Sequence, residues 1–288
     1  MRLAIVDQIS DPGEPGKPND DALAHGDTFA AAFDGATGIA DRALVPGADS
    51  DAAWIARLAA DVFCEHAPRD LSTAEIVRAA SSSARFHIEA LHSLADLPRY
   101  SWPTSSFVMG RLVDENLELS GLGDCVAYVR SPDGKILRHC ALPANRGNEQ
   151  AFAKALLEQA GGYRGGWGIP REGPVLDRMR KARSTQNLPG GIWTLGLEPD
   201  ASEQVAVRTL AAAPKTTILV MSDGFAALAE DYLDIEPREM LARAGRGGLA
   251  ELLDRLRHLE RELDPDALRW PRFKRSDDAT AILAEITE

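Results

Sequence analysis

Two aspartates in this chain stand where apolar runs end. An apolar run at 28–32 leads to Asp34 and a second run at 216–222 leads to Asp223, and a glycine follows each aspartate. A carboxylate at the tip of a buried strand is held rigidly, and the glycine behind it lets the backbone come close to a bound group. Two such strands can place their carboxylates face to face, which is an arrangement that hard divalent cations bind.

Other acidic residues occupy similar positions beside predicted strands. They are Asp20 and Asp21 before a short strand at 22–24, Asp124 before a strand at 125–129, and Asp277-Asp278 before an alternating strand at 279–286. A solvated turn explains each position when it is taken alone. Because all of them adjoin apolar β runs, the whole set is hard to explain as solvated turns.

The elements that position these carboxylates follow from hydrophobic periodicity. Helical spacing begins at Ser50, and a second helix begins with a capping-box pattern at 72–75. Short strands with tight turns from 104 to 137 indicate an antiparallel meander. Two more helices are expected around 237–244 and 249–263, before the last strand. This order predicts antiparallel sheet layers with helices on the outside.

Residues 145–191 have the weakest pattern. Residues 150–159 have a helical pattern, and a glycine-rich loop follows at 161–168. That loop lacks the preceding strand and the glycine spacing of a phosphate-binding loop. We therefore expect a single domain over residues 1–288, with a variable, flap-like insertion at about 145–191.

Composition excludes several classes of protein. The net charge of -12 argues against general binding to nucleic acid or to anionic membranes, because both need a basic surface. Three cysteines without a C-x-x-C pair argue against a disulfide framework or a structural zinc site, and favour a reducing compartment. The N-terminus reaches Asp7 too early for a signal peptide, and no apolar run approaches the roughly 20 residues of a membrane span. We expect a cytoplasmic protein.

The ordered set of acidic motifs resembles the metal-dependent serine/threonine protein phosphatases of the PP2C (PPM) family, bacterial type. The resemblance covers nearly the whole chain and is weakest between residues 140 and 200. It implies an α+β fold, an αββα sandwich of two mostly antiparallel sheets flanked by helices. It also implies hydrolysis of phosphoserine and phosphothreonine on phosphoprotein substrates. The matching pieces are Asn19-Asp20-Asp21, Asp34-Gly35-x-x-Gly38, Thr104-Ser105-Ser106, Gly123-Asp124, Ser222-Asp223-Gly224 and Asp277-Asp278-Ala279-Thr280.

The resemblance also implies roles for these residues around two Mn²⁺ or Mg²⁺ ions. Asp34 would bridge both ions, Asp223 and Asp277 would complete the first site, and the Gly35 carbonyl would serve the second. The remaining residues are Asp20 and Asp21, which would act mainly through metal-bound waters, and Asp124, which with Asp223 would match a third, weaker site of bacterial members. A hydroxide that bridges the two ions would attack the phosphomonoester in line, so Asp34, Asp223 and Asp277 would act in catalysis through metal-bound water.

Three departures from the family pattern concern the substrate more than the metal centre. The family's phosphate-binding Arg falls at Gly16, Ala36 replaces a His that many eukaryotic members carry as a possible proton donor, and Asp278 replaces the usual Asn. The acidic replacement would favour tighter metal binding. Candidates for the missing positive charge are Lys17, Arg272, Lys274 and Arg275. The alternative for each of them is that it belongs to a solvated basic loop and binds no phosphate.

Two other functions stay open at this point. The same metal centre can serve a small phosphomonoester instead of a phosphoprotein. Alternatively, the chain is a catalytically weak phosphoprotein-binding or scaffold module, which the missing Arg favours and the complete set of carboxylates disfavours. Turnover of a phosphopeptide against a small ester separates the two substrates, and titration with Mn²⁺ tests the binding module.

Overall fold

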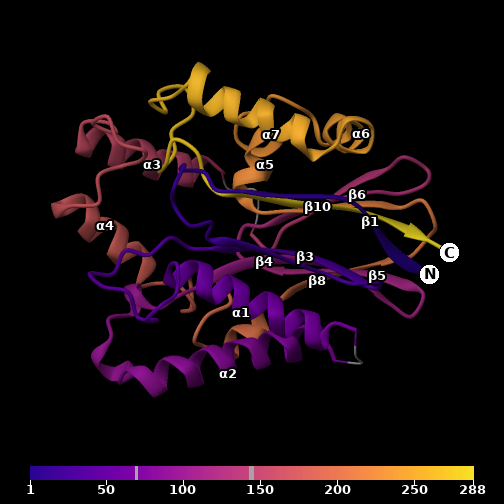
Figure 1. Cartoon of the computed structure of the whole chain (residues 1–288), viewed down its shortest axis with the longest axis horizontal. Coiled ribbons are helices and arrows are strands. Elements are labelled where there is room, and N and C mark those ends of the chain that lie inside the picture. The colour runs from indigo at the N-terminus through magenta and orange to yellow at the C-terminus, as the bar shows by residue number, and fades with distance from the viewer. Residues whose placement is uncertain (69–70, 143–145) are drawn as a thin grey trace.

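The computed structural model describes residues 1–68, 71–142 and 146–288. Two five-stranded sheets pack face to face, and helices cover both outer sides (Figure 1). Neighbouring strands in both sheets run antiparallel. The predicted α+β class and αββα arrangement are therefore confirmed.

The first sheet joins the two ends of the chain. Its first and last strands pair from Arg2 opposite Thr287 to Asp11 opposite Ala279, so the termini lie side by side (Figure 1). The strands, in spatial order, are β1 (Arg2–Asp11), β10 (Ala279–Thr287), β9 (Thr217–Met221), β6 (Val126–Arg130) and β7 (Ile136–His139).

The second sheet carries Asp34 within a strand. We expected the run at 28–32 to stop at an Asp-Gly turn, but the strand continues through Asp34 and Gly35. The reason is pairing on both sides, because Asp34 stands opposite Asp21 on one neighbour and Ser106 on the other. The strands, in spatial order, are β2 (Asp21–His25), β3 (Phe29–Gly35), β4 (Ser105–Val113), β5 (Asn116–Leu122) and β8 (Ala206–Ala211).

Separate groups of helices cover the outer faces of the two sheets (Figure 1). α1 (Asp51–His66) and α2 (Thr73–Leu91) lie on the second sheet, while α5 (Asp223–Glu230), α6 (Pro237–Gly247) and α7 (Leu249–His258) lie on the first. The predicted capping box is present, since the Ser72 side chain accepts from the Glu75 backbone and the Glu75 side chain accepts from the Ser72 backbone. Short helical turns lie at Leu94–Asp96, Arg99–Ser101, Pro199–Gln204 and Leu259–Leu263. No helix in the described ranges is long and apolar enough to cross a membrane.

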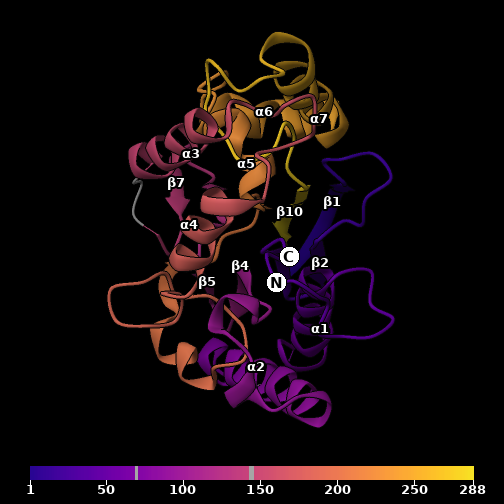
Figure 2. The same ribbon diagram turned by 90° about the vertical axis from the view of Figure 1, so that its left-hand side faces the viewer.

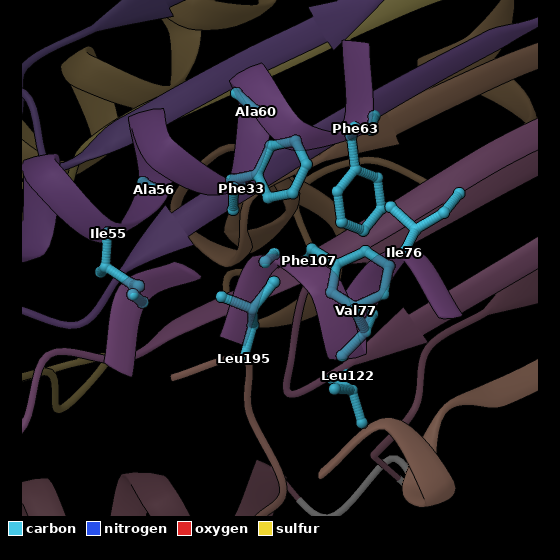
Figure 3. Close-up of a cluster of buried hydrophobic side chains, with 14 of the residues drawn as sticks. Phe33, Ile55, Ala56, Ala60, Phe63, Ile76, Val77, Phe107, Leu122 and Leu195 are labelled. Atoms are coloured by element: carbon cyan, nitrogen blue, oxygen red, sulfur yellow. The ribbon is translucent and has the colours of Figure 1, made fainter. Parts of the chain in front are cut away.

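Aromatic packing fixes the end of β3 where Asp34 lies. Phe33 is fully buried between the second sheet and its helices, and its ring centroid is 5.0 Å from Phe63 and 6.0 Å from Phe107 (Figure 3). Burial of a side chain of this size contributes about 1.5–3 kcal/mol. Because successive side chains of a strand point to opposite faces, Asp34 is directed away from this helix layer, toward the first sheet. A third apolar layer, with Val108, Val220 and Ile282, fills the space between the sheets.

The segment predicted to be an insertion lies at one end of the sandwich and contains two helices, α3 (Arg146–Ala160) and α4 (Gly173–Arg183) (Figures 1 and 2). The helix expected at 150–159 is present within α3, whereas α4 was not expected. Residue 145, where the predicted insertion begins, lies outside the described residues. An apolar cluster of the insertion includes Ala267 and contacts Phe273, both from the segment before β10. Backbone hydrogen bonds tie the same two segments together, including Ile169 N to Phe273 O at 2.9 Å.

Candidate metal centre

Three acidic residues meet at one end of the second sheet. Asp21 and Asp34 are direct neighbours on β2 and β3, and the backbone N–H of Asp124 points at Ser106 Oγ, 3.5 Å away, on β4. One ligand atom each from Asp34, Asp124 and Cys125 lie within 4.8 Å of one another. Burial raises the pKa of the Cys125 thiol well above its usual range, so the thiol stays protonated and the oxygens are the available ligands.

Two more carboxylates come from the first sheet. Asp223 is the first residue of α5, directly after β9, and Asp277 lies two residues before β10. β9 and β10 are paired, which brings the end of β9 and the start of β10, and so Asp223 and Asp277, close together. A Cβ on Gly224 would lie 2.0 Å from the Asp278 carbonyl oxygen, so glycine is required for this close approach. The two sheets thus supply carboxylates to the same end of the sandwich.

These carboxylates share a cavity of about 280 Å³ under the insertion. Asp34, Asp124, Asp223 and Asp277 line it, and Glu149 from α3 adds another acidic side chain. Asp21 is buried beside Asp34, and its Oδ2 has no hydrogen-bond partner. A buried carboxylate oxygen without a partner is costly unless a cation binds it. The donor set therefore fits a hard divalent cation.

The pKa values of the clustered carboxyl groups also indicate a site for a cation. Burial, followed by the charges of Asp223 and Asp21, raises the pKa of Asp34 well above its usual range. Burial and the charge of Asp124 raise the pKa of Asp223 to about 7. Burial, followed by the charge of Asp278, raises the pKa of Asp21 well above its usual range. Since the protein supplies too little positive charge to neutralise these groups, a divalent cation would stabilise their ionised forms.

Asp277 has a positive partner, Lys274. Burial opposes its ionised form, but the Lys274 ammonium group donates to Asp277 Oδ1 and lowers the pKa of that carboxyl below its usual range. Burial also opposes the charge of Lys274, yet Asp277 and Asp278 outweigh it and raise the pKa of the amine. The structure therefore brings Lys274, one of the predicted phosphate-binding residues, into the cavity. Its ammonium group is shared with Asp277.

Asp20 faces away from this cavity. Its carboxylate accepts a hydrogen bond from Ser50 Oγ, which in turn accepts from the Ala53 backbone N–H at the start of α1. Its own carbonyl accepts from Gly35 N at 3.2 Å. A Cβ on Gly35 would lie 2.4 Å from that carbonyl oxygen, so only glycine fits here. Asp20 thus holds the ends of β3 and α1 in place.

Asp278 binds the loop between β1 and β2. One of its carboxylate oxygens accepts from Gly13 N and the other from Asp20 N, both at 2.9 Å. Both oxygens are therefore engaged by backbone N–H groups, which an asparagine with a single acceptor oxygen could not reproduce.

Replacement of Asp278 by Ala is expected to lower the free energy of unfolding by about 2 kcal/mol or more, because two N–H groups lose their acceptor. The dissociation constant for Mn²⁺ should rise by less than about tenfold, because the substitution removes a negative charge beside Asp21 but no metal ligand. Urea unfolding and calorimetric titration measure these two quantities, with Asp254→Ala on the exposed face of α7 as the control. Unchanged stability together with much weaker Mn²⁺ binding would instead make Asp278 part of the metal centre.

The other predicted basic residues do not line this cavity, although Arg272 lines a neighbouring cavity together with Asp223 and Asp277. Arg272 pairs with Asp264 at 2.8 Å, and Arg275 Nε donates to the Pro265 carbonyl at 2.9 Å. Both guanidinium groups thus hold the loop that precedes β10. Lys17 is exposed and lines an adjoining groove together with Asp20.

Two arginines that the sequence analysis did not single out do line the cavity. Arg183, the last residue of α4, donates from Nη1 to the Ala36 carbonyl and from Nη2 to the Thr37 carbonyl, each at 3.4 Å. Arg171 Nη1 donates to the Gly38 carbonyl at 2.9 Å. The proline at position 174, a common helix-start signal, marks α4, but no signal in the sequence connects α4 to residues 36–38.

The whole chain superimposes on bacterial serine/threonine phosphatases. The Mycobacterium tuberculosis phosphatase PstP/Ppp matches with a TM-score of 0.57 and 18% identity over 100% of both chains. The catalytic domain of PstP in complex with two manganese ions matches with a TM-score of 0.56 and 18% identity, over 100% of this chain and 99% of that one. The S. agalactiae serine/threonine phosphatase matches with a TM-score of 0.55 and 13% identity, over 99% of this chain and 100% of that one.

Sequence comparison adds nothing to this likeness, since no family model and no curated protein matches the chain. At 13–18% identity the structural likeness shows a shared fold. The chain has the fold of bacterial serine/threonine phosphatases, and its carboxylates form a candidate metal centre at one end of that fold.

Proposed function

We propose that this protein is a metal-dependent phosphatase that hydrolyses phosphoserine and phosphothreonine on proteins. The observation that carries the proposal is the carboxylate cluster at the end of the sandwich, in which Asp21 Oδ2 is buried without a partner and the pKa values of Asp34 and Asp223 are raised. The shared fold with serine/threonine phosphatases, one of them in complex with two manganese ions, supports it.

We assign the residues that would hold the ions from this geometry and from the family resemblance. Asp34, Asp223, Asp277 and the Gly35 carbonyl would hold two Mn²⁺ or Mg²⁺ ions, with Asp21 beside them. Asp124 with Asp223 would serve a third, weaker site. Two such ions, when bound, supply an activated water and positive charge that offsets the phosphoryl oxygens.

The chain's own residues set the geometry of the reaction. Phe33 and the pairing of β3 on both sides fix Asp34, and the close contact of Gly224 with Asp278 fixes Asp223 relative to Asp277. Lys274 keeps Asp277 ionised and oriented. Ala36 offers no proton at the position of the family's histidine, so the leaving alkoxide takes its proton from solvent in the open cavity.

The surroundings of the cavity favour a peptide substrate. The adjoining groove that contains Lys17 meets the cavity at Thr37, Arg171 and Lys274, which line both. A phosphorylated side chain in the cavity can therefore leave its peptide backbone in the groove. A small phosphomonoester would use the cavity alone.

We also propose that residues 1–288 form one domain and that the segment from about 145 to 191 is a flap-like insertion in it. The insertion's apolar cluster includes Ala267 and packs against Phe273, and Lys274 pairs with Gly168. These contacts connect the insertion to the segment that carries Asp277. They support its place beside the metal centre.

Hydrolysis assays with Mn²⁺, Mg²⁺ or EDTA test the proposal. We expect para-nitrophenyl phosphate and a phosphothreonine peptide to be hydrolysed only with metal, with the higher kcat/KM for the peptide. Turnover of small esters without turnover of the peptide would indicate a small-molecule phosphatase. Folded protein that binds Mn²⁺ by calorimetry but hydrolyses neither substrate would indicate a binding module.

A further inference from the structure

Arg171 and Arg183 are cations without a carboxylate partner in the described parts of the chain. No carboxylate of those parts lies within ion-pair distance of either guanidinium group, although both line a cavity rich in carboxylates. Other arginines of the insertion are paired, since Arg164 binds Glu172 at 2.7 Å and Arg180 binds Asp41 at 2.5 Å. The positive charge of the two cavity arginines is therefore available to a ligand.

Backbone carbonyls hold these two arginines without neutralising them. The carbonyls belong to residues 36–38, the three residues that directly follow Gly35 at the end of β3. A guanidinium group has five N–H donors, and each of these arginines uses one or two of them on a carbonyl. Arg183 is partly buried and lines the same cavity as Asp34 and Asp124.

We propose that Arg183, with Arg171 where the cavity meets the adjoining groove, binds the phosphate group of the substrate in place of the arginine that is missing at Gly16. A planar guanidinium fork matches two phosphoryl oxygens, and hydrogen bonds of this charged type are about twice as strong as neutral ones. This inference rests on the proposed phosphatase function. It moves the phosphate-binding role from the N-terminal loop to the insertion.

The attachment of the insertion explains how these arginines reach the metal centre. On one side Gly168 pairs with Lys274, three residues before Asp277. On the other side Arg183 is anchored to the carbonyls of Ala36 and Thr37, directly after the Asp34 strand. The insertion therefore contacts the chain segments that carry Asp277 and Asp34, and its last helix ends with a cation that lines the cavity.

Substitutions of Arg183 test this proposal. In Arg183→Met we expect the KM for the phosphothreonine peptide and the inhibition constant of inorganic phosphate to rise by about 10- to 100-fold, which is the size of a lost charged hydrogen bond. Arg183→Lys should recover part of the loss, because it restores the charge but not the bidentate fork. Arg178→Ala is the matched control, because Arg178 lies on the same helix but is exposed and bonded to Gln159 at 2.9 Å.

Two further measurements separate phosphate binding from other effects. The Mn²⁺ dissociation constant of Arg183→Met should stay within about threefold of wild type or become tighter, because a repelling charge is removed. If Arg183→Met folds and its KM for the peptide and its inhibition constant for phosphate equal those of the wild type, the proposal is wrong. If that variant does not fold, Arg171→Met takes its place, since Arg171 is exposed and makes one hydrogen bond.

The proposal and the phosphatase function can fail separately. If the wild-type protein hydrolyses no phosphate ester, calorimetric binding of inorganic phosphate to the Mn²⁺-loaded protein still tests Arg183, and weaker binding in Arg183→Met supports its role. If hydrolysis is metal-dependent but both arginine variants behave as wild type, the phosphatase function stands and the arginine assignment is wrong.

Discussion

Replacement of Asp34 by Asn is expected to reduce Mn²⁺-dependent hydrolysis of para-nitrophenyl phosphate by at least about 1,000-fold without unfolding the protein. A loss of this size corresponds to about 4 kcal/mol of transition-state stabilisation, which is reasonable for a residue expected to bridge two metal ions. The fold should persist, because Phe33 and the pairing of β3 hold this strand in place. In EDTA the variant should even melt at a higher temperature, because one of the mutually repelling carboxylates is gone.

Controls for this experiment lie within the same chain. Asp223→Asn should show a similar loss of activity, because it removes the carboxylate that faces Asp34 from the other sheet. Asp254→Asn, on the exposed face of α7, should behave as wild type. If Asp34→Asn retains more than about a tenth of wild-type kcat/KM, the assignment of Asp34 as the bridging ligand is wrong.

The stability of the metal-free protein is expected to fall as pH rises through the range from about 4 to 7. The folded pKa of Asp223 is about 7 against an ordinary value of 3.8, and those of Asp34 and Asp21 are also raised. A group with a raised folded pKa stabilises the fold below its unfolded pKa, and this contribution is lost as pH approaches the folded value. The melting temperature in EDTA should therefore be lower at pH 7.5 than at pH 5.5, by about 5 °C or more.

Addition of Mn²⁺ should reverse this trend, because the cation binds the ionised carboxylates and competes with protons. The measurement is a set of thermal unfolding curves from pH 5 to 8, each with EDTA and with excess Mn²⁺. Asp223→Asn provides the comparison, since loss of this group should flatten the pH dependence in EDTA. A metal-free protein whose stability is constant or rises across this range would contradict the raised pKa values.

The acidic half of the site could be predicted from the sequence because its signals are local. Asp34, Asp124, Asp223 and Asp277 each adjoin an apolar run, so strand periodicity alone places them at strand ends. The structure puts all four in one cavity. The exact element boundaries differ, because pairing extends β3 past Asp34 to Gly35, and a helix that was not predicted begins at Asp223.

The basic half of the site could not be predicted, because its contacts are not local. Arg183 reaches the Ala36 carbonyl across 147 residues, from a helix in the part of the chain with the weakest pattern. Arg272 was a reasonable candidate by its nearness to Asp277 in sequence. Its ion pair with Asp264 depends on how the loop before β10 folds back, which periodicity does not encode.

The pairing of β1 with β10 has a consequence for how the protein folds. The contact between Arg2 and Thr287 spans 285 residues, and topologies dominated by such distant contacts fold slowly. Asp277 lies two residues before β10, so the carboxylate cluster is incomplete until this last strand docks between β1 and β9. Binding of a metal ion would then follow the slow step of folding. The ion would stabilise the folded state but not the transition state for folding, so it would slow unfolding and leave the refolding rate unchanged.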